Sequence, residues 1–182
     1  MIIRQQDCLP QPWKNGLGST REIAVHPSGA SSDHFLWRVS VAEVDSAAPF
    51  SAFPGIDRTI ALLAGAGFTM TLDDGRVHAL HTPFEPFMFP GEAQVAVALV
   101  HGPTRDFNLM VRRAHARGEL HVQRTPGTCL LDPATVLVYA AHGTIDTTDG
   151  TLHAGDAWRP TADRFTLLDG AVAFVIKIEH IA

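Results

Sequence analysis

The chain has 182 residues, of which 46% are apolar, and its formal net charge at pH 7 is −5. This length and apolar content suffice for a sizeable hydrophobic core, and the acidic balance excludes the basic surface that nucleic-acid binding requires. Residues 1–7 lack the apolar run of an export signal, and no window reaches the roughly 18 apolar residues of a membrane helix. We therefore expect a cytoplasmic protein with no membrane partner, in which Cys8 and Cys129 are reduced thiols.

The densest polar segment lies near the N-terminus, at residues 12–22, PWKNGLGSTRE. Gly16 and Gly18 let the backbone approach a ligand or adopt a positive φ. Hydrogen-bond donors that suit an anion are supplied by Lys14, Asn15, Thr20 and Arg21. The segment lacks the third glycine and the Gly-Lys-Ser/Thr ending of a phosphate-binding loop. An alternative interpretation is a capping loop in which Trp13 closes one end of a barrel.

Apolar residues then alternate with polar or small ones over residues 37–44, 93–100 and 106–112, which predicts β-strands. In the first of these runs, Arg38 and Ser40 share one face. An arginine on the inner face of a small barrel must meet a carboxylate, a ligand or water, and its planar guanidinium suits a bidentate carboxylate. Asn108 is a further candidate for the same pocket, because an amide both donates and accepts hydrogen bonds.

Residues 49–58 combine aromatic residues, prolines and a glycine, and they predict a rigid rim that contributes Phe53 and Arg58 to the pocket. In the alternative interpretation, Asp57 and Arg58 only fix a turn while Phe50 and Phe53 close the core.

Two hairpin turns are indicated at residues 73–75 and 148–150, where Asp-Gly favours tight turns. They belong to an internal similarity between residues 59–80 and 135–155, which suggests a duplicated hairpin-rich unit. Convincing helices are scarce. We therefore predict an all-β fold of double-stranded β-helix (jelly-roll) type, with an N-terminal half at residues 1–120 that holds the pocket and a C-terminal half at residues 121–182 that completes the fold.

The ten histidines do not predict a metal site. His78 and His81 would point to opposite faces of a regular strand, and Glu85 downstream does not complete a ligand set. No Gly-x-Ser-x-Gly elbow or cysteine signature indicates a nucleophile. We therefore expect no metal and no cofactor, and the sequence leaves any catalytic residue unknown.

A series of motifs in order resembles the HutD/Ves family: PWKNGLGSTRE (12–22), WRVSVA (37–42), FSAFPGIDR (50–58), LAGAG (63–67), FPGE (89–92) and DFNLMVR (106–112). The resemblance is dense over residues 11–113. It implies a cupin-superfamily, bicupin-like fold and a role in histidine utilisation, with regulation through binding of a small pathway intermediate. On this chain, it implies a ligand shell that contains Lys14, Asn15, Thr20, Arg21, Arg38, Ser40 and Asn108. Together with the residue-level argument, the full expected site is Trp13, Lys14, Asn15, Thr20, Arg21, Arg38, Ser40, Phe53, Arg58 and Asn108.

The leading hypothesis is a non-enzymatic protein that binds a small carboxylate, such as formylglutamate or urocanate, and modulates histidine breakdown. One alternative is a cofactor-free enzyme acting on the same intermediates, with Glu22 or Glu92 as general base. Another is an interaction module whose motif residues only stabilise the fold. Pairing of two copies into a homodimer is left open by the sequence.

Overall fold

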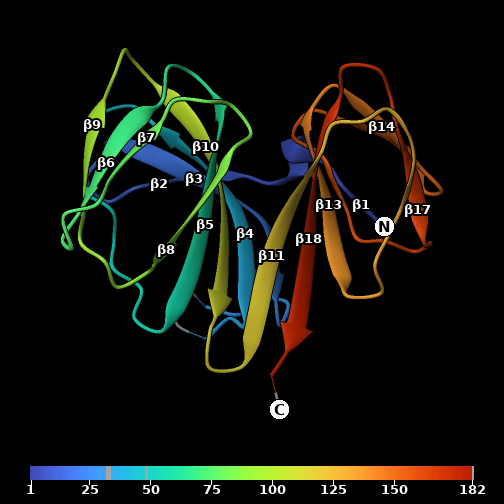
Figure 1. The fold of residues 1–182 in the computed structure, drawn as a ribbon, viewed down its shortest axis with the longest axis horizontal. Helices are drawn as coiled ribbons and strands as arrows, with labels where there is room; N and C mark the ends of the chain where they lie inside the picture. The colour runs from blue at the N-terminus through green and yellow to red at the C-terminus, as the bar shows by residue number, and fades with distance from the viewer. Residues whose placement is uncertain (32–33, 48, 182) are drawn as a thin grey trace. The chain divides into compact units, whose positions relative to one another are not determined.

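The computed structural model describes residues 1–31, 34–47 and 49–181. Regular structure in these residues is almost entirely β, with one short 3-10 turn, η1 (Gln5–Asp7). The prediction of an all-β chain is thus confirmed, and no helix in the described residues is long and apolar enough to cross a membrane. The chain divides into two compact units, one formed by residues 9–116 and the other by residues 1–8 together with 117–181 (Figure 1).

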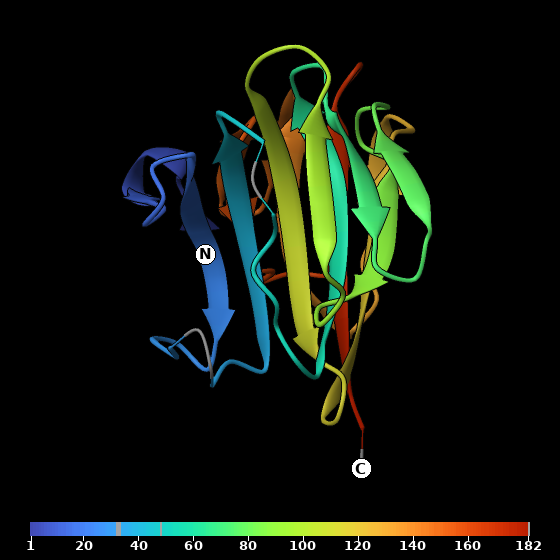
Figure 2. The ribbon, with the colours of Figure 1, turned by 90° about the vertical axis from the view of Figure 1, so that its left-hand side faces the viewer.

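The larger unit, residues 9–116, is built from two sheets. The six-stranded sheet has the order β2 (Pro10–Pro12), β3 (Gly18–His26), β4 (Trp37–Val44), β10 (Thr104–Arg112), β5 (Ile56–Ala64) and β8 (Pro86–Pro90). The three-stranded sheet has the order β7 (Val77–Leu80), β6 (Phe68–Leu72) and β9 (Val95–Leu99). The strands expected from alternation at residues 37–44, 93–100 and 106–112 are therefore present as β4, β9 and β10, and Figure 2 shows the larger unit from its side.

The inner face of the larger unit carries its core. On β5, Ile60 and Leu62 are both completely buried, and they pack with Phe68 and Met70 of β6 and with Phe89 of β8. Burial of each such side chain contributes about 1.5–3 kcal/mol to folding. Because side chains two apart share a face of a strand, Arg58 lies on the same inner face as Ile60 and Leu62. A charged side chain is thus placed at one end of the apolar row that Ile60 and Leu62 form on β5.

The smaller unit, residues 1–8 and 117–181, also contains two sheets. The five-stranded sheet has the order β1 (Ile2–Ile3), β16 (Ala157–Trp158), β13 (Thr135–His142), β18 (Val172–His180) and β11 (Ala116–Gln123). The four-stranded sheet has the order β12 (Gly127–Leu130), β17 (Arg164–Leu167), β14 (Thr144–Thr147) and β15 (Gly150–His153). Its core is closely packed around the fully buried Trp158, together with Val138 and Phe165.

The division of the chain differs from the expected boundary after residue 120. Ile2 pairs with Trp158 and Ile3 with Ala157, so the first eight residues belong to the smaller unit, and the larger unit ends at residue 116. Arg4 strengthens this attachment, because its Nη1 donates to Asp156 Oδ2 at 2.7 Å. A two-residue strand has no recognisable period, which is why the sequence did not indicate this pairing.

The two units repeat one order of strand pairing. In the larger unit, β5 pairs with β8 and β10, and β6 pairs with β7 and β9. In the smaller unit, β13 pairs with β16 and β18, and β14 pairs with β15 and β17. The similar sequence segments at residues 59–80 and 135–155 fall on equivalent strands of this pattern, β5 to β7 and β13 to β15.

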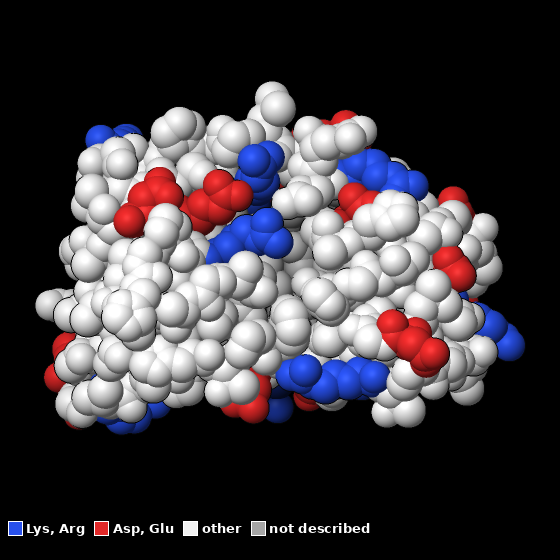
Figure 3. Space-filling model, turned by 90° about the horizontal axis from the view of Figure 1, so that it is seen from above, with Lys and Arg blue, Asp and Glu red and all other residues white. Residues whose placement is uncertain are grey.

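Charged side chains are sparse on the face of the molecule drawn in Figure 3. Basic and acidic side chains lie there in small groups among uncharged ones, with no extended basic surface. This distribution is in keeping with a chain in which only 18% of the residues are charged.

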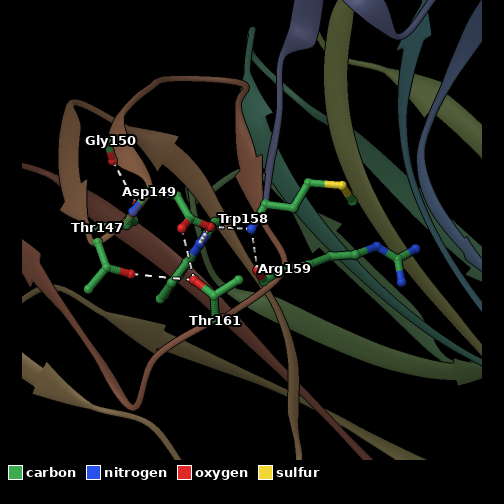
Figure 4. A network of polar contacts seen from close by, with 8 residues as sticks. Thr147, Asp149, Gly150, Trp158, Arg159 and Thr161 are labelled. Atoms are coloured by element: carbon green, nitrogen blue, oxygen red, sulfur yellow. Dashed lines mark hydrogen bonds and ion pairs between the residues drawn. The ribbon is translucent and has the colours of Figure 1, made fainter.

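The β14–β15 hairpin turns at the expected Asp-Gly step, and Asp149 organises a polar network there (Figure 4). Its carboxylate accepts hydrogen bonds from Trp158 Nε1 at 2.8 Å and Thr161 Oγ1 at 2.9 Å, and it pairs with the ammonium group of Met1. The bonds from the ammonium, Trp158 and Thr161 lower the pKa of Asp149 to about 2. The network therefore holds the N-terminal segment against the smaller unit to which it belongs.

Candidate ligand-binding site

The larger unit contains a cavity of about 460 Å³. Its walls come from the N-terminal segment, strands β3, β4, β5 and β10, and the segment that precedes β5. The lining residues are Gln11, Pro12, Trp13, Lys14, Asn15, Thr20, Arg38, Ser40, Ala42, Val44, Pro49, Phe50, Ser51, Phe53, Arg58, Asp106, Asn108 and Met110. A cavity of this size with a few convergent polar groups is typical of small-molecule sites.

Strand register places the polar side chains of the cavity in rows across the sheet. Asn108 on β10 is paired with Ser40 on β4, and Met110 is paired with both Arg38 and Arg58. Asn108 and Met110 are two positions apart on β10, as are Arg38 and Ser40 on β4, so each pair shares one face of its strand. These four residues and Arg58 line the cavity. The alternation that forms the sheet therefore also assembles the site.

A hydrogen-bonded chain runs along the most buried part of the cavity. Arg58 Nη2 donates to Asn108 Oδ1 at 2.8 Å, and Asn108 Nδ2 donates to Asp106 Oδ1 at 2.5 Å. The exposed fractions of Arg58, Asn108 and Asp106 are 7%, 5% and 1%. Lys14 and Asn15 are exposed in contrast, so the cavity runs from a solvent-exposed cationic mouth to an inner end that contains a carboxyl group.

Burial shifts the pKa values of both charged groups in this hydrogen-bonded series, Asp106 and Arg58. Desolvation raises the pKa of Asp106 to about 7, although the nearby Arg58 cation and the hydrogen bond from Asn108 act in the opposite direction. Desolvation also lowers the pKa of Arg58 to about 10, and Asp106 partly offsets this effect. Asp106 thus changes charge near neutral pH, while Arg58 stays positive there.

Aromatic rings surround the buried guanidinium. The Cζ atom of Arg58 lies 5.1 Å from the ring centre of Phe50, 5.6 Å from that of Phe53 and 4.9 Å from that of Phe89. Each ring face attracts the cation, which offsets part of the cost of removing it from water. The rim segment is held in place because Phe53 N donates to Gly91 O at 2.7 Å.

The N-terminal segment forms a tight turn over the mouth of the cavity. Trp13 N donates to Gly18 O at 2.9 Å, and Trp13 Nε1 donates to Thr20 Oγ1 at 2.8 Å. A Cβ atom at Gly18 would lie 2.3 Å from Glu43 O and 2.9 Å from the Trp13 ring, so only glycine fits there. The Oδ1 atom of Asn15 accepts from Leu17 N at 3.0 Å, so part of the function of Asn15 is to shape the turn.

Arg38 is partly neutralised before any ligand binds, because its Nε donates to Glu22 Oε2 at 2.8 Å. Glu22 lies on the same face of β3 as Thr20, whereas Arg21 lies on the opposite face and approaches Glu43 at 3.8 Å. Arg21 does not line the cavity. Its inclusion in the expected ligand shell is therefore corrected: residues 18–26 form strand β3, and the alternation of side chains along this strand turns Arg21 away from the cavity.

The structure brings together every other expected residue: Trp13, Lys14, Asn15, Thr20, Arg38, Ser40, Phe53, Arg58 and Asn108 all line the cavity. The sequence reasoning missed Phe50 and Asp106 as lining residues. The signal for Asp106 was present, because it stands two positions before Asn108 on a predicted strand and must share its face.

Histidines do not contribute to the cavity. In the described part of the chain, no group of three or more His, Cys, Asp or Glu side chains could hold a metal ion. The ring of His78 instead stacks on Phe87, with ring centres 3.8 Å apart. This packing desolvates His78 and lowers the pKa of its imidazole.

The sequence matches the family model described as HutD over residues 5–174. The chain belongs to the HutD family. A relative from Pseudomonas putida, described as an uncharacterized 21.2 kDa protein in the hutC 3′ region, is 40% identical over 147 residues, which are 80% of this chain and 75% of the relative. Protein Ves from Cronobacter sakazakii is 39% identical over 111 residues, 60% of this chain and 59% of its own.

Solved structures agree with the HutD assignment. The structure of HutD from Pseudomonas fluorescens SBW25, obtained in a formate condition, matches 100% of this chain and 99% of its own with a TM-score of 0.86 and 30% identity. A cupin 2 conserved barrel domain protein from Leptotrichia buccalis matches with a TM-score of 0.60 at 8% identity, over 100% of this chain and 96% of its own. The chain is therefore all-β with cupin-like structural neighbours.

Proposed function

We propose that the larger unit binds a small carboxylate intermediate of histidine catabolism, resembling formylglutamate or urocanate, and that this binding regulates the pathway. The observation that carries the proposal is the cavity itself, which combines the cations of Lys14, Arg38 and Arg58 with the buried polar side chains of Ser40 and Asn108. Arginine forks and such donors suit carboxylates.

Membership of the HutD family supports the pathway. The Pseudomonas putida relative is described by its place in the hutC 3′ region, which links that protein to histidine utilisation. Formate, present when the Pseudomonas fluorescens HutD structure was obtained, is the simplest carboxylate and belongs among the probes. The formal net charge of −5 favours a small molecule over a nucleic acid as partner.

A binding role is favoured over catalysis by the state of the two candidate bases. Glu22 is held in an ion pair with Arg38, and Glu92 does not line the cavity. Two oxygens of Glu92 are engaged by Arg113, at 2.6 Å and 2.8 Å, and this bonding lowers the pKa of Glu92. Neither carboxylate is placed to remove a proton from a ligand in the cavity.

We propose further that each unit is a cupin-like barrel, which makes the chain a bicupin that functions in the cytoplasm. The equivalent strand pairing of β5 to β10 and β13 to β18 supports a duplicated barrel. The cavity described above belongs to the larger unit, and ligand binding is assigned to that copy.

Calorimetric titration of the purified protein with urocanate, formylglutamate, formiminoglutamate and formate tests the proposal. We expect at least one of these acids to bind, and we expect Arg38→Gln to weaken it about tenfold or more, as is usual when a charged hydrogen bond to a ligand is lost. Arg21→Gln is the matched control, since Arg21 faces away from the cavity on the adjacent strand. Absence of binding by all four acids, or equal weakening by both variants, contradicts the proposed site.

An enzyme assay separates binding from turnover. Incubation of excess ligand with the protein, followed by mass spectrometry, should return the ligand unchanged. Conversion of a bound acid into a product would instead favour the cofactor-free enzyme.

A further inference from the structure

Two polar atoms at the inner end of the cavity lack a partner in the protein. They are Asp106 Oδ2 and Arg58 Nε, each with essentially no exposed surface and no hydrogen bond to any described residue. Both residues line the cavity. A buried polar group without a partner is rare in folded proteins, and it indicates either strain or a function.

Strand register explains why these two groups do not bond each other. Arg58 is paired with Met110 and Asp106 with Leu62, so the two side chains start four positions apart along the strands. Four strand residues span about 13 Å, and Asn108 lies between them as a bridge. The side chain of Asn108 makes both contacts of this bridge, because its oxygen accepts from Arg58 and its nitrogen donates to Asp106.

The orientation of the Asn108 amide determines what the inner end offers to a ligand. A guanidinium can only donate, so the Asn108 oxygen must face Arg58, and the amide nitrogen must face Asp106. The charged carboxylate of Asp106 then has one oxygen occupied and keeps a second oxygen that can only accept. The inner end of the cavity therefore presents one acceptor and, at Arg58 Nε, one donor.

We propose that Asp106 is a specificity-determining residue, which selects carboxylates that also carry an N–H donor beside an acceptor, as in an amide, an amidine or an imidazole. The inference rests on the proposed binding function and adds to it the N–H group that the ligand must carry besides its carboxylate. The carboxylate of the ligand meets the cations near the mouth, Lys14 and Arg38, and its N–H group donates to Asp106 Oδ2. A molecule with a carboxylate alone leaves the buried acceptor unpaired and is discriminated against.

Two pairs of ligands test the N–H group, and the second pair replaces that group alone. The first pair is urocanate and 3-(2-furyl)acrylate, in which a five-membered ring without N–H replaces the imidazole. The second pair is formylglutamate and its ester analogue 2-(formyloxy)glutarate, in which oxygen replaces the N–H. Binding is measured at pH 8, above the pKa of about 7 to which burial raises Asp106, so that the carboxylate is charged.

In the native protein, we expect the N–H member of at least one pair to bind ten to a hundred times more tightly than its analogue, in line with the effect of one unpaired buried group. In Asp106→Asn, the amide oxygen accepts from Asn108, and an NH₂ group replaces Oδ2. The new NH₂ group then faces the N–H group of the ligand, and both can only donate. The preference for the N–H member of a pair over its analogue should therefore fall below about threefold. Ser40→Ala is the control: Ser40 is 3% exposed and lines the same cavity, so its loss should weaken both members of a pair equally.

The outcomes separate the two proposals. Equal binding of both members of every pair by the native protein, or an unchanged preference in Asp106→Asn, overturns the role of Asp106 and leaves the carboxylate site standing. If none of these acids binds, and formate does not bind either, the proposed function is overturned and this inference with it.

Discussion

Replacement of Asp106 by Asn should stabilise the protein at neutral and alkaline pH and remove part of the pH dependence of its stability. The carboxyl group of Asp106 is 1% exposed, and desolvation raises its pKa in the folded protein to about 7, from a usual value of 3.8. Between pH 3.8 and pH 7, the folded chain therefore holds a proton at Asp106 that the unfolded chain has released. The free energy of unfolding must fall as the pH rises through this window and level off above it.

The magnitude follows from the pKa difference. Each pKa unit corresponds to about 1.4 kcal/mol, so the full window is worth about 4 kcal/mol and the part between pH 5.5 and pH 7 about 2 kcal/mol. An asparagine side chain has nearly the same shape, still accepts the hydrogen bond from Asn108, and carries no charge at any pH. Arg58, whose pKa is about 10, stays positive throughout this range.

Urea unfolding at pH 5.5 and pH 8.0 measures the effect. From pH 5.5 to pH 8.0, the native protein should lose about 2 kcal/mol of stability relative to Asp106→Asn, and titration of the histidines cancels in this comparison. Asp74→Asn is the control, because Arg76 lowers the pKa of the exposed Asp74, which titrates below this range. If the native protein and Asp106→Asn change in parallel within ~0.5 kcal/mol, the burial argument for Asp106 is refuted.

Three further substitutions test the packing and the polar contacts. In Gly91→Ala, the new Cβ would lie 2.6 Å and 2.8 Å from the backbone oxygens of residues 53 and 56. We therefore expect thermal unfolding to show a loss of about 2 kcal/mol of stability, and we expect weaker ligand binding because the rim is displaced. Phe68→Ala removes a fully buried ring and should cost about 3–5 kcal/mol by urea titration, whereas a loss below ~1 kcal/mol would contradict the packing of this core. Asp149→Asn should lower Tm at pH 7. Because the pKa of about 2 lies below the usual 3.8, the contribution of Asp149 to stability is present above pH 3.8 and is lost as the pH falls through 2. The Tm values of the native protein and of Asp149→Asn should therefore become equal near pH 2.

Much of the fold and most of the site could be predicted from local pattern. Alternation is a local property, and it correctly indicated β4 and β10, together with the shared face of Arg38 and Ser40. The same rule, applied two positions before Asn108, would have found Asp106. Arg21 was wrongly expected in the cavity, because the glycines and polar residues around it concealed the alternation of strand β3.

Other features depend on contacts that the sequence does not display. The hydrogen bond from Arg58 to Asn108 joins residues 50 positions apart. The orientation of the Asn108 amide depends on both Arg58 and the neighbouring carboxyl group of Asp106. The attachment of Ile2 to Trp158 joins residues 156 positions apart, and a pair of isoleucines has no periodicity from which a strand could be predicted. Long-range register is set by the whole sheet, which local propensity does not describe.

The pairing of β1 with β16 also sets an order of events on the ribosome. Residues 9–116 form a compact unit, and that unit can fold while the remainder is still being made. Ile2 and Ile3, although they are synthesised before the larger unit, have no strand to join until Trp158 has left the exit tunnel. Residues 1–8, which precede the larger unit in the chain, thus reach their place only after residues that follow that unit have been made, and Met1 meets Asp149 at this late stage.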